Sequence, residues 1–452
     1  MSDAALAELA AALGPAGCLT GPAMTGASRL HDASGHRAEG LPLALLRPAT
    51  GDEIAAAMAI CHRHGLAVVP QGGLSGLAGA ANAGPGQIAL SLARFHGIET
   101  IDSASGAMVV RAGTVLQTAQ EAAAEAGFLL PIDLGARGSC QVGGIVATNA
   151  GGVRVLRHGT TRDNVLGLEA VLPDGRVISH LNRVTKDNTG YDLRHLLIGS
   201  EGTLAVITRV VLRLRPLPAP PETALCALPD FDAVIALMGD ARARLDLSAF
   251  EVMWRDHFEM SGGAGLFAER PPLVVLIEAE GGGLEPVLEA AFEAGLITDA
   301  LLAKSGAEAR RFWEIRESLH PTRDLDGLLN LDVSLPVAAM APFVADCTAR
   351  VRALDPAADC YFFGHVGDGN LHLMAALPGL DWQAGETALQ AAAYDLVRAA
   401  GGSISAEHGI GTLKRPFLGQ SRSADEIALM RAIKAVFDPA GRMNPGKLLP
   451  AQ

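Results

Sequence analysis

The chain has 452 residues, 49% of them hydrophobic and 19% charged, which suits two or three domains with large cores and argues against disorder. Its net charge of −13 argues against nucleic acid as a partner, because phosphate contacts need clustered lysine and arginine. The six cysteines include no C-x-x-C pair, which is typical of a reduced protein.

The first residues, MSDAALAELAAALGPAG, predict an alanine-rich helix without the basic segment of a signal peptide. Apolar runs such as PPLVVLIEA are too short to span a membrane. We therefore expect a cytoplasmic protein without a membrane span.

Residues 42–76 predict a strand, a helix and a second strand. Thr50 and Glu53 form a helix start, Gly65 ends the helix, and 66–70 is a short buried strand that opens into a glycine-rich loop. Further apolar runs lie at 88–92, 107–111, 168–172, 177–178 and 204–214. This pattern predicts an α+β fold without regular alternation of strands and helices.

The proline-rich stretch RPLPAPPET, residues 215–223, predicts a linker between two domains. Helices and strands alternate after it, which predicts a second α+β domain. The expected helices are 231–244, 308–320, 338–353 and 385–400, and the expected strands are 249–253, 273–279, 329–335, 360–366 and 371–376.

Three glycine-rich clusters lie in the first half, at 72–76, 133–152 and 197–208. Glycines let backbone N–H groups approach a phosphate, although each cluster alone also suits tight turns. Neither a G-x-G-x-x-G fingerprint nor a Walker loop is present, because Gln71 stands where the first glycine would be needed and no G-K-[ST] follows. The clusters together favour one phosphate-bearing cofactor bound in another way.

Six segments in this order resemble those of the FAD-linked 2-hydroxy acid dehydrogenases: PQGGLSGLAG, DLGARGSCQVGGIVATNAGG, KDNTGYDLRHLLIGSEGTL, GHVGDGNLH, SAEHGIG and MNPGK. These enzymes are the branch of the vanillyl-alcohol oxidase/p-cresol methylhydroxylase flavoproteins that contains D-lactate dehydrogenase, the glycolate oxidase large subunit and D-2-hydroxyglutarate dehydrogenase. The resemblance implies a two-part FAD-binding domain of the p-cresol methylhydroxylase type over 1–215. An α+β substrate domain with an antiparallel sheet and a metal site follows over 216–420, and a segment over 421–452 returns to the flavin.

The resemblance also implies the residues around a non-covalent FAD. Two glycine segments would embrace the pyrophosphate, and further residues would line the flavin and the adenine. These residues are Gln71, Gly72, Gly73, Leu74, Ser75, Gly76, Asp133, Gly138, Ser139, Gly143, Gly144, Thr148, Gly152, Glu201, Gly202, Ile207 and Asn444.

The stretch FFGHVGDGNLHL places His365 and His372 symmetrically about an Asp-Gly dipeptide. Asp-Gly favours a two-residue type I′ hairpin, which would set the histidines opposite each other with Cβ atoms ~5 Å apart. Glu407, in SAEHGIG, offers a third ligand for a divalent metal, Zn²⁺ before Mn²⁺ or Fe²⁺. A hairpin with incidental histidines is the alternative, but these positions match the family's metal ligands.

The implied reaction is oxidation of a D-2-hydroxy acid to the 2-keto acid. The metal would lower the pKa of the substrate hydroxyl, His408 would remove its proton, and the hydride would pass to flavin N5. Arg316 occupies the family's position for the substrate carboxylate.

Three positions of the substrate site depart from the 2-hydroxyglutarate enzymes of this family. Asn330 stands where those relatives have a lysine, His320 where they have a hydroxyl residue, and Met374 where they have an asparagine. Loss of the lysine removes a counter-charge for a second carboxylate, which favours a smaller or more apolar acid, whereas His320 could still supply a polar or cationic contact. We therefore expect a D-lactate-like or a D-2-hydroxyglutarate-like substrate.

Two other functions stay open: an oxidase that reduces O2, and a non-catalytic FAD-binding subunit of an electron-transfer complex. For the dehydrogenase, the electron acceptor would be an electron-transfer flavoprotein, a quinone or a cytochrome. A homodimer is a further expectation.

Overall fold

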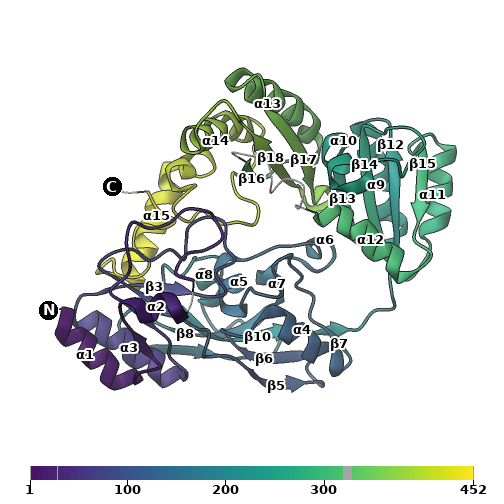
Figure 1. The fold of residues 1–452 in the computed structure, drawn as a ribbon. Helices are drawn as coiled ribbons and strands as arrows, with labels where there is room; N and C mark the ends of the chain where they lie inside the picture. The colour runs from purple at the N-terminus through teal and green to yellow at the C-terminus, as the bar shows by residue number, and fades with distance from the viewer. Residues whose placement is uncertain (1, 28, 319–327, 451–452) are drawn as a thin grey trace. The chain divides into compact units, whose positions relative to one another are not determined.

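The computed structural model describes residues 2–27, 29–318 and 328–450, and the chain forms two compact units (Figure 1). Unit 1 comprises Met1–Gly152, His158–Leu217 and Glu407–Gln452. Unit 2 comprises Val153–Arg157 and Pro218–Ala406. Both units combine helices with sheets, so the predicted α+β class is confirmed.

The first sheet of unit 1 has four strands, and its three longer strands are parallel. Their order is β1 (Cys18–Leu19), β2 (Ala44–Leu46), β4 (Gln87–Ser91) and β3 (Ala67–Gln71). The helices of this part are α1 (Ser2–Leu13), α2 (Pro22–Ala27) and α3 (Gly51–Arg63). Thr50 caps α3 by accepting a hydrogen bond from the backbone N–H of Glu53 at 3.1 Å, as its sequence predicted.

The second sheet of unit 1 has five antiparallel strands. Their order is β5 (Ile98–Asp102), β6 (Ala107–Arg111), β10 (Val206–Arg213), β8 (Val165–Val171) and β9 (Val177–His180). Strands β7 (Phe128–Leu129) and β11 (Arg215–Pro216) form a separate two-stranded sheet. The helices of this part are α4 (Leu116–Glu125), α5 (Val142–Thr148), α6 (Val155–His158), α7 (Thr161–Asn164) and α8 (Arg194–Leu197). The first three residues of α6 belong to unit 2. One apolar core joins both sheets of the unit.

The end of the chain completes unit 1. The 3-10 helix η5 (Arg415–Gln420) precedes α15 (Ala424–Phe437). Beyond α15, Met443 pairs with Val68 of β3, and the backbone N–H of Asn444 donates to the Val68 carbonyl at 2.7 Å. The last residues therefore add to the edge of the four-stranded sheet, beside the strand that leads into the first glycine cluster.

Unit 2 is built on one antiparallel sheet of seven strands. Their order is β15 (Asp299–Leu302), β12 (Glu222–Leu228), β14 (Leu273–Glu280), β13 (Asp246–Trp254), β17 (Asp359–Gly364), β18 (Asn370–Ala376) and β16 (Leu328–Ser334). The antiparallel sheet predicted for the second domain is confirmed. Strands β12 and β15 and helix α11 lack a counterpart among the predicted elements.

Helices pack on the sheet of unit 2 in two groups. Helices α13 and α14 contact each other and the strands β16 and β17, while α9, α11 and α12 contact the strands at the other end. The helical elements are α9 (Phe231–Arg244), α10 (Arg255–Phe258), the π-helix η1 (Glu259–Gly263), α11 (Leu284–Glu293), α12 (Gly306–Glu317), η3 (Val337–Ala339), α13 (Met340–Leu354), η4 (Val366–Asp368) and α14 (Trp382–Ala399).

The units do not coincide with the predicted domain bounds throughout, and Val153–Arg157, inside the predicted first domain, belong to unit 2. The first boundary, between Leu217 and Pro218, lies inside the proline-rich linker. The second lies between Ala406 and Glu407, whereas the sequence suggested residue 420. The assignment of functions to these domains stays a prediction. Within the described ranges, no helix combines the length and hydropathy needed to cross a membrane.

Candidate active site

The two predicted metal-binding histidines lie at the connection between β17 and β18. The register pairs His372 with Phe363, so the predicted type I′ turn with the histidines directly opposite each other is wrong. The carbonyl of His365 accepts two backbone hydrogen bonds, which close a 3-10 turn, and Gly369 returns the chain with a φ of 91°. The two imidazole rings are still neighbours, edge to face, with centroids 5.5 Å apart.

A buried glutamate of β13 fixes the first histidine. The Glu251 side chain is 2% exposed, and its carboxylate lies 2.7 Å from Nδ1 of His365. It also accepts from Nε of Arg316 at 2.8 Å. Burial alone would raise the pKa of Glu251, but the two basic neighbours outweigh it and lower the pKa. With Nδ1 turned to a carboxylate, Nε2 is the atom of His365 that would bind a metal.

A second buried carboxylate stands behind the other histidine. Oδ1 of Asp332, on β16, lies 3.6 Å from Nδ1 of His372. The same side chain accepts from Nδ2 of Asn370 at 2.8 Å and from the backbone N–H of Ala406 at 3.0 Å. Asp332 therefore also fixes the point at which the chain leaves unit 2, one residue before Glu407.

The strands beside the histidines carry two of the predicted substrate residues, Met374 and Asn330. Met374 is buried in an apolar cluster and lies opposite Tyr361 of β17 and Asn330 of β16. Cross-strand partners share a face of the sheet, so these three side chains start from the same face. His320 lies outside the described residues.

Arg316, predicted to bind the substrate carboxylate, is almost buried in unit 2. Its guanidinium carbon lies 4.8 Å from the ring centroid of Phe363, and that ring stacks on His257 at 4.1 Å. Burial and, to a lesser degree, the charge of Arg316 lower the pKa of His257 to about 3. His257 is therefore neutral near pH 7, and Arg316 carries the positive charge of this cluster.

In unit 1, the first two glycine clusters face each other closely. A Cβ on Gly72 would lie 3.4 Å from Cα of Gly144, and a Cβ on Gly73 would lie 1.9 Å from the carbonyl oxygen of Ser139. Gly152 has a φ of 94° and would likewise clash with a carbonyl oxygen, at 2.0 Å. Gly73 and Gly152 are therefore required for the approach of two backbone segments.

The other predicted cofactor residues also belong to unit 1. Two hydroxyls bond to backbone carbonyls within their own segment: Thr148 donates to Gly144 at 3.1 Å and Ser139 donates to Ala136 at 3.3 Å. Ile207 packs in the apolar core. The remaining predicted cofactor residues of this unit are Gln71, Leu74, Ser75, Gly76, Asp133, Gly138, Gly143, Glu201, Gly202 and Asn444.

Buried amide side chains near these clusters present oxygen acceptors. Nε2 of Gln71 donates to the carbonyl of Ala81 at 2.8 Å, and Nδ2 of Asn444 donates to the carbonyl of Glu201 at 2.8 Å. The side-chain oxygens of Gln71, Gln141 and Asn444 have no hydrogen-bond partner within residues 2–27, 29–318 and 328–450. Such acceptors fit a cofactor that brings N–H and O–H donors, as the isoalloxazine and ribityl groups of FAD do.

Glu201 anchors the segment that carries the predicted third metal ligand. Its buried carboxylate accepts backbone hydrogen bonds from Ile410 and Gly411, both at 2.7 Å. Burial raises the pKa of Glu201 despite these bonds. On the other side of His408, Oε1 of Glu407 accepts from the backbone N–H of Gly152 at 2.5 Å. His408 is thus held between two anchored neighbours within unit 1.

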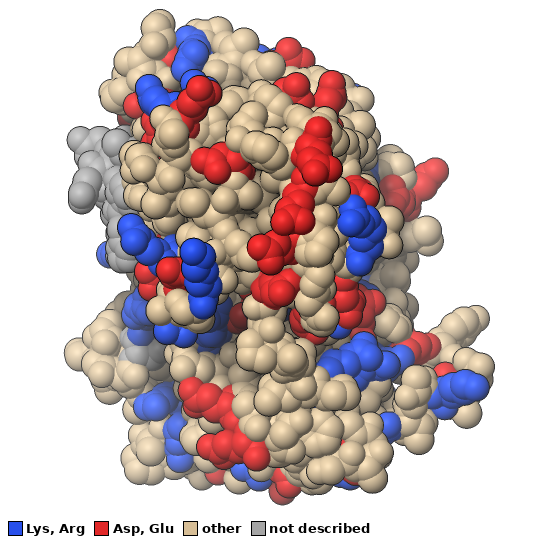
Figure 2. All heavy atoms as spheres, turned by 90° about the vertical axis from the view of Figure 1, so that its right-hand side faces the viewer, with Lys and Arg blue, Asp and Glu red and all other residues tan. Residues whose placement is uncertain are grey.

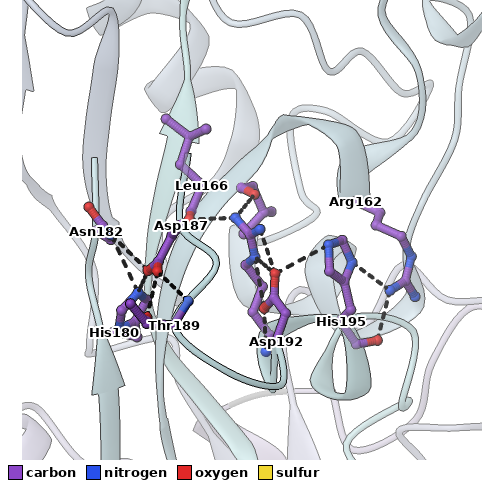
Figure 3. Close-up of polar contacts among 10 residues, drawn as sticks. Arg162, Leu166, His180, Asn182, Asp187, Thr189, Asp192 and His195 are labelled. Atoms are coloured by element: carbon purple, nitrogen blue, oxygen red, sulfur yellow. Dashed lines mark hydrogen bonds and ion pairs between the residues drawn. The ribbon is translucent and has the colours of Figure 1, made fainter. Parts of the chain in front are cut away.

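The motif KDNTGYDLRHLLIGSEG is shaped by two surface carboxylates (Figure 3). Asp187 contacts Nε2 of His180 at 2.7 Å and accepts from Nδ2 of Asn182 at 3.1 Å. Hydrogen bonds, led by that of Thr189, lower the pKa of Asp187. Asp192 pairs with Arg194 at 2.6 Å, and that guanidinium also donates to β8 carbonyls. These bonds fix the loop that leads to Glu201.

Charges of both signs are interspersed on the surface. On the face that Figure 2 shows, lysine and arginine side chains form small groups, and acidic side chains lie among and between these groups. This distribution agrees with the net charge of −13 in giving no extended basic surface there for nucleic acid.

Two family models together match most of the chain. The model described as FAD binding domain matches residues 42–180, and that described as FAD linked oxidases, C-terminal domain, matches residues 217–448. The chain belongs to the FAD-linked oxidase family. This confirms that the predicted family is FAD-linked.

Relatives of this FAD-linked oxidase match it over most of their length. A D-2-hydroxyglutarate dehydrogenase of Xanthomonas citri pv. viticola is 40% identical over 420 residues, 90% of this chain and 89% of that protein. The mitochondrial D-2-hydroxyglutarate dehydrogenase of Bos taurus is also 40% identical, over 90% of this chain and 76% of that protein. A protein of Schizosaccharomyces pombe with the name "Putative D-lactate dehydrogenase C713.03, mitochondrial" is 39% identical over 89% of this chain and 81% of that protein. These relatives confirm the predicted family branch and enzyme class, an FAD-dependent 2-hydroxy acid dehydrogenase.

Solved structures share the fold of this FAD-linked oxidase at low sequence identity. p-Cresol methylhydroxylase has a TM-score of 0.77 at 16% identity, covering 98% of this chain and 96% of that chain. Alkyldihydroxyacetonephosphate synthase has a TM-score of 0.75 at 15% identity, covering 98% and 84%. The fold predicted from the motifs, that of p-cresol methylhydroxylase, is confirmed.

The sequence reasoning missed Glu251 and gave Asp332 no role. A signal for Glu251 was present, because it is the one charged residue in the apolar run LSAFEVMW, residues 247–254. A charged residue that is buried in a strand needs a partner, which makes it a candidate for a functional site.

Proposed function

We propose that this FAD-dependent dehydrogenase oxidises a D-2-hydroxy acid with the help of a divalent metal, Zn²⁺ by preference. The observation that supports the metal is the pair of neighbouring imidazoles in unit 2, His365 and His372. A buried carboxylate lies 2.7 Å from Nδ1 of His365, and another lies 3.6 Å from Nδ1 of His372. Carboxylates in that position orient histidines for metal binding through Nε2 and raise their basicity.

Chain connectivity supports Glu407 as the third ligand. Asp332 stands behind His372 and also holds the backbone of Ala406, and Glu407 follows Ala406 directly. Two imidazoles and a carboxylate leave a coordination position for substrate, which is typical of catalytic zinc. His408 is the proposed base, held between Glu407 and Ile410 by their backbone and carboxylate anchors.

When bound, the flavin accepts the hydride and the metal polarises the substrate hydroxyl. Residues of the chain orient the substrate, remove its proton and exclude water. Arg316 orients the substrate through its carboxylate, and His408 takes the hydroxyl proton as the 2-keto acid forms. Buried apolar neighbours, such as Met374, keep water away from the reacting atoms.

The substrate we favour is D-lactate or a 2-hydroxy acid with a short apolar side chain. Met374 and Tyr361 flank one another on adjacent strands, and the position opposite Met374 carries the neutral Asn330. A second carboxylate would need a cation there, and asparagine supplies none. D-2-Hydroxyglutarate, on which relatives at 40% identity act by name, is the second candidate.

An external acceptor, such as an electron-transfer flavoprotein, a quinone or a cytochrome, would reoxidise the flavin. The acceptor, the cytoplasmic location and a homodimer stay proposals. Reoxidation of the reduced flavin by air, followed by stopped flow, separates this dehydrogenase from an oxidase.

The decisive experiment is anaerobic dye reduction with a panel of D- and L-2-hydroxy acids, repeated after EDTA treatment and with His372→Ala. We expect turnover of D-lactate that EDTA and the substitution abolish, while bound FAD is retained. If none of the acids reduces the flavin, the dehydrogenase reading is lost and the FAD-binding subunit is favoured. If EDTA and His372→Ala leave the rate unchanged, the metal has no role.

A further inference from the structure

The carboxylate of Glu251 contacts two predicted functional groups at once. It lies 2.7 Å from Nδ1 of His365, and it accepts from Nε of Arg316 at 2.8 Å. Nη2 of Arg316 lies 2.6 Å from the same carboxylate. All three residues belong to unit 2, but they come from β13, α12 and the turn after β17.

We infer that Glu251 is a positioning residue that couples metal binding at His365 to recognition of the substrate carboxylate by Arg316. The inference rests on the proposed function and adds a residue to it. Because one carboxylate holds both groups, neither can shift without moving the hydrogen bonds of the other. An ordered Arg316 therefore depends on the same side chain that presents Nε2 of His365 to the metal.

The surroundings leave the three groups little room to move. The side chains of Glu251, Arg316 and His365 are 2%, 5% and 10% exposed. The ring of Phe363 lies against the guanidinium, with 4.8 Å between the guanidinium carbon and the ring centroid. A carboxylate held so rigidly between a guanidinium and an imidazole sets the orientation of both.

A purely structural role is the competing explanation, in which Glu251 only neutralises a buried arginine. The neighbouring strand β14 offers a matched control for it. Glu278 is also buried, pairs with Arg154 and accepts from Nε1 of Trp313 at 2.9 Å, yet it contacts none of the predicted ligands. Loss of either carboxylate disturbs the sheet, but only Glu251 reaches a histidine of the site.

The test compares Glu251→Gln with Glu278→Gln in the FAD-loaded protein. Zinc affinity is measured by competition with a chromophoric chelator, and kcat and KM are measured with D-lactate. In Glu251→Gln we expect zinc affinity to fall about 10- to 100-fold and KM to rise about tenfold with FAD content unchanged. Glu278→Gln should keep both values within about twofold of the wild type.

If Glu251→Gln does not fold, Glu251→Asp is measured in its place. It keeps the charge, but its shorter side chain cannot reach both partners, so zinc affinity should still fall. Wild-type zinc affinity in a folded Glu251 variant, or equal losses in Glu278→Gln, would overturn the inference. If the wild-type protein itself binds no zinc, the metal of the proposed function fails instead.

Discussion

The predicted functional residues of the two units are held by different kinds of groups. In unit 1, glycines let two backbone segments come into contact, and buried amide side chains present oxygen acceptors. Unit 2 uses buried charge: Glu251 and Asp332 stand behind two histidines in a seven-stranded sheet. A large cofactor is held through many weak backbone contacts, whereas a small substrate and an ion need a few strong, oriented charges.

This contrast predicts that unit 1 is most sensitive to added volume. Gly73→Ala places a Cβ 1.9 Å from the carbonyl oxygen of Ser139 and 2.9 Å from Cα of Cys140. Overpacking of on the order of 3 kcal/mol should weaken FAD binding about 100-fold. The measurement is an FAD titration of the apoprotein, followed by flavin fluorescence.

Gly135→Ala is the control for this change, because its added Cβ would meet no atom within 4 Å. It should bind FAD like the wild type, and both variants should keep their zinc affinity. Equal FAD affinity in the two alanine variants would contradict the role of close backbone approach in unit 1.

A buried charge also matters in unit 1, at the segment that carries the proposed base. Glu201→Gln replaces a carboxylate that accepts from two backbone N–H groups at 2.7 Å. We expect a loss of roughly 3 kcal/mol, because hydrogen bonds to charged groups contribute strongly and one N–H would face the amide NH2. Hydrogen exchange of the Ile410 and Gly411 amides measures this loss of stability.

The exposed capping box of α15 provides the comparison for Glu201. Glu426→Ala removes the side chain that accepts a hydrogen bond from the Ser423 backbone N–H, so faster exchange should be confined to the first turn of that helix. Unchanged protection of Ile410 and Gly411 in Glu201→Gln would show that its carboxylate is not the anchor.

A buried neutral histidine of unit 2 predicts a dependence of stability on pH. His257 has its pKa lowered from 6.5 to about 3, so the unfolded chain binds one more proton between these values. The contribution of neutral His257 to the free energy of unfolding is present above pH 6.5 and is lost as the pH falls. Between pH 6.5 and 5 the free energy of unfolding should decrease by about 2 kcal/mol. His257→Phe keeps a ring against Phe363 without titrating.

Denaturant unfolding of the wild type and His257→Phe between pH 7.5 and 5 measures this difference. The free energy of unfolding of His257→Phe should change less with pH than that of the wild type. The difference in stability between the two proteins should therefore become smaller toward acid pH. Parallel curves would mean that His257 keeps an ordinary pKa in the fold.

The smallest expected effect is a change in substrate preference when a cation is placed at position 330. Asn330→Lys adds a cation opposite Met374 and should raise kcat/KM for D-2-hydroxyglutarate relative to D-lactate about tenfold. Asn330→Gln adds length without charge and should leave the ratio unchanged. A ratio that does not respond to the lysine would place the distal end of the substrate elsewhere.

The sequence by itself determined the local features. The Thr50 cap, the glycine clusters and the turn between β17 and β18 are each encoded within a few residues, and each was predicted, although the type of turn and the pairing of the histidines were wrong. Their physical causes, a capping hydroxyl, a missing Cβ and a turn between two strands, are local as well. The six ordered motifs were sufficient for the family.

The tertiary structure decided which groups stand behind the ligands. Glu251 is 114 residues from His365 and 65 from Arg316, and only the neighbouring position of β13 and β17 brings its carboxylate to them. The register of β17 and β18 likewise replaced the predicted histidine pair with Phe363 opposite His372. Strand order and register depend on the packing of the whole sheet, so no local pattern specified them.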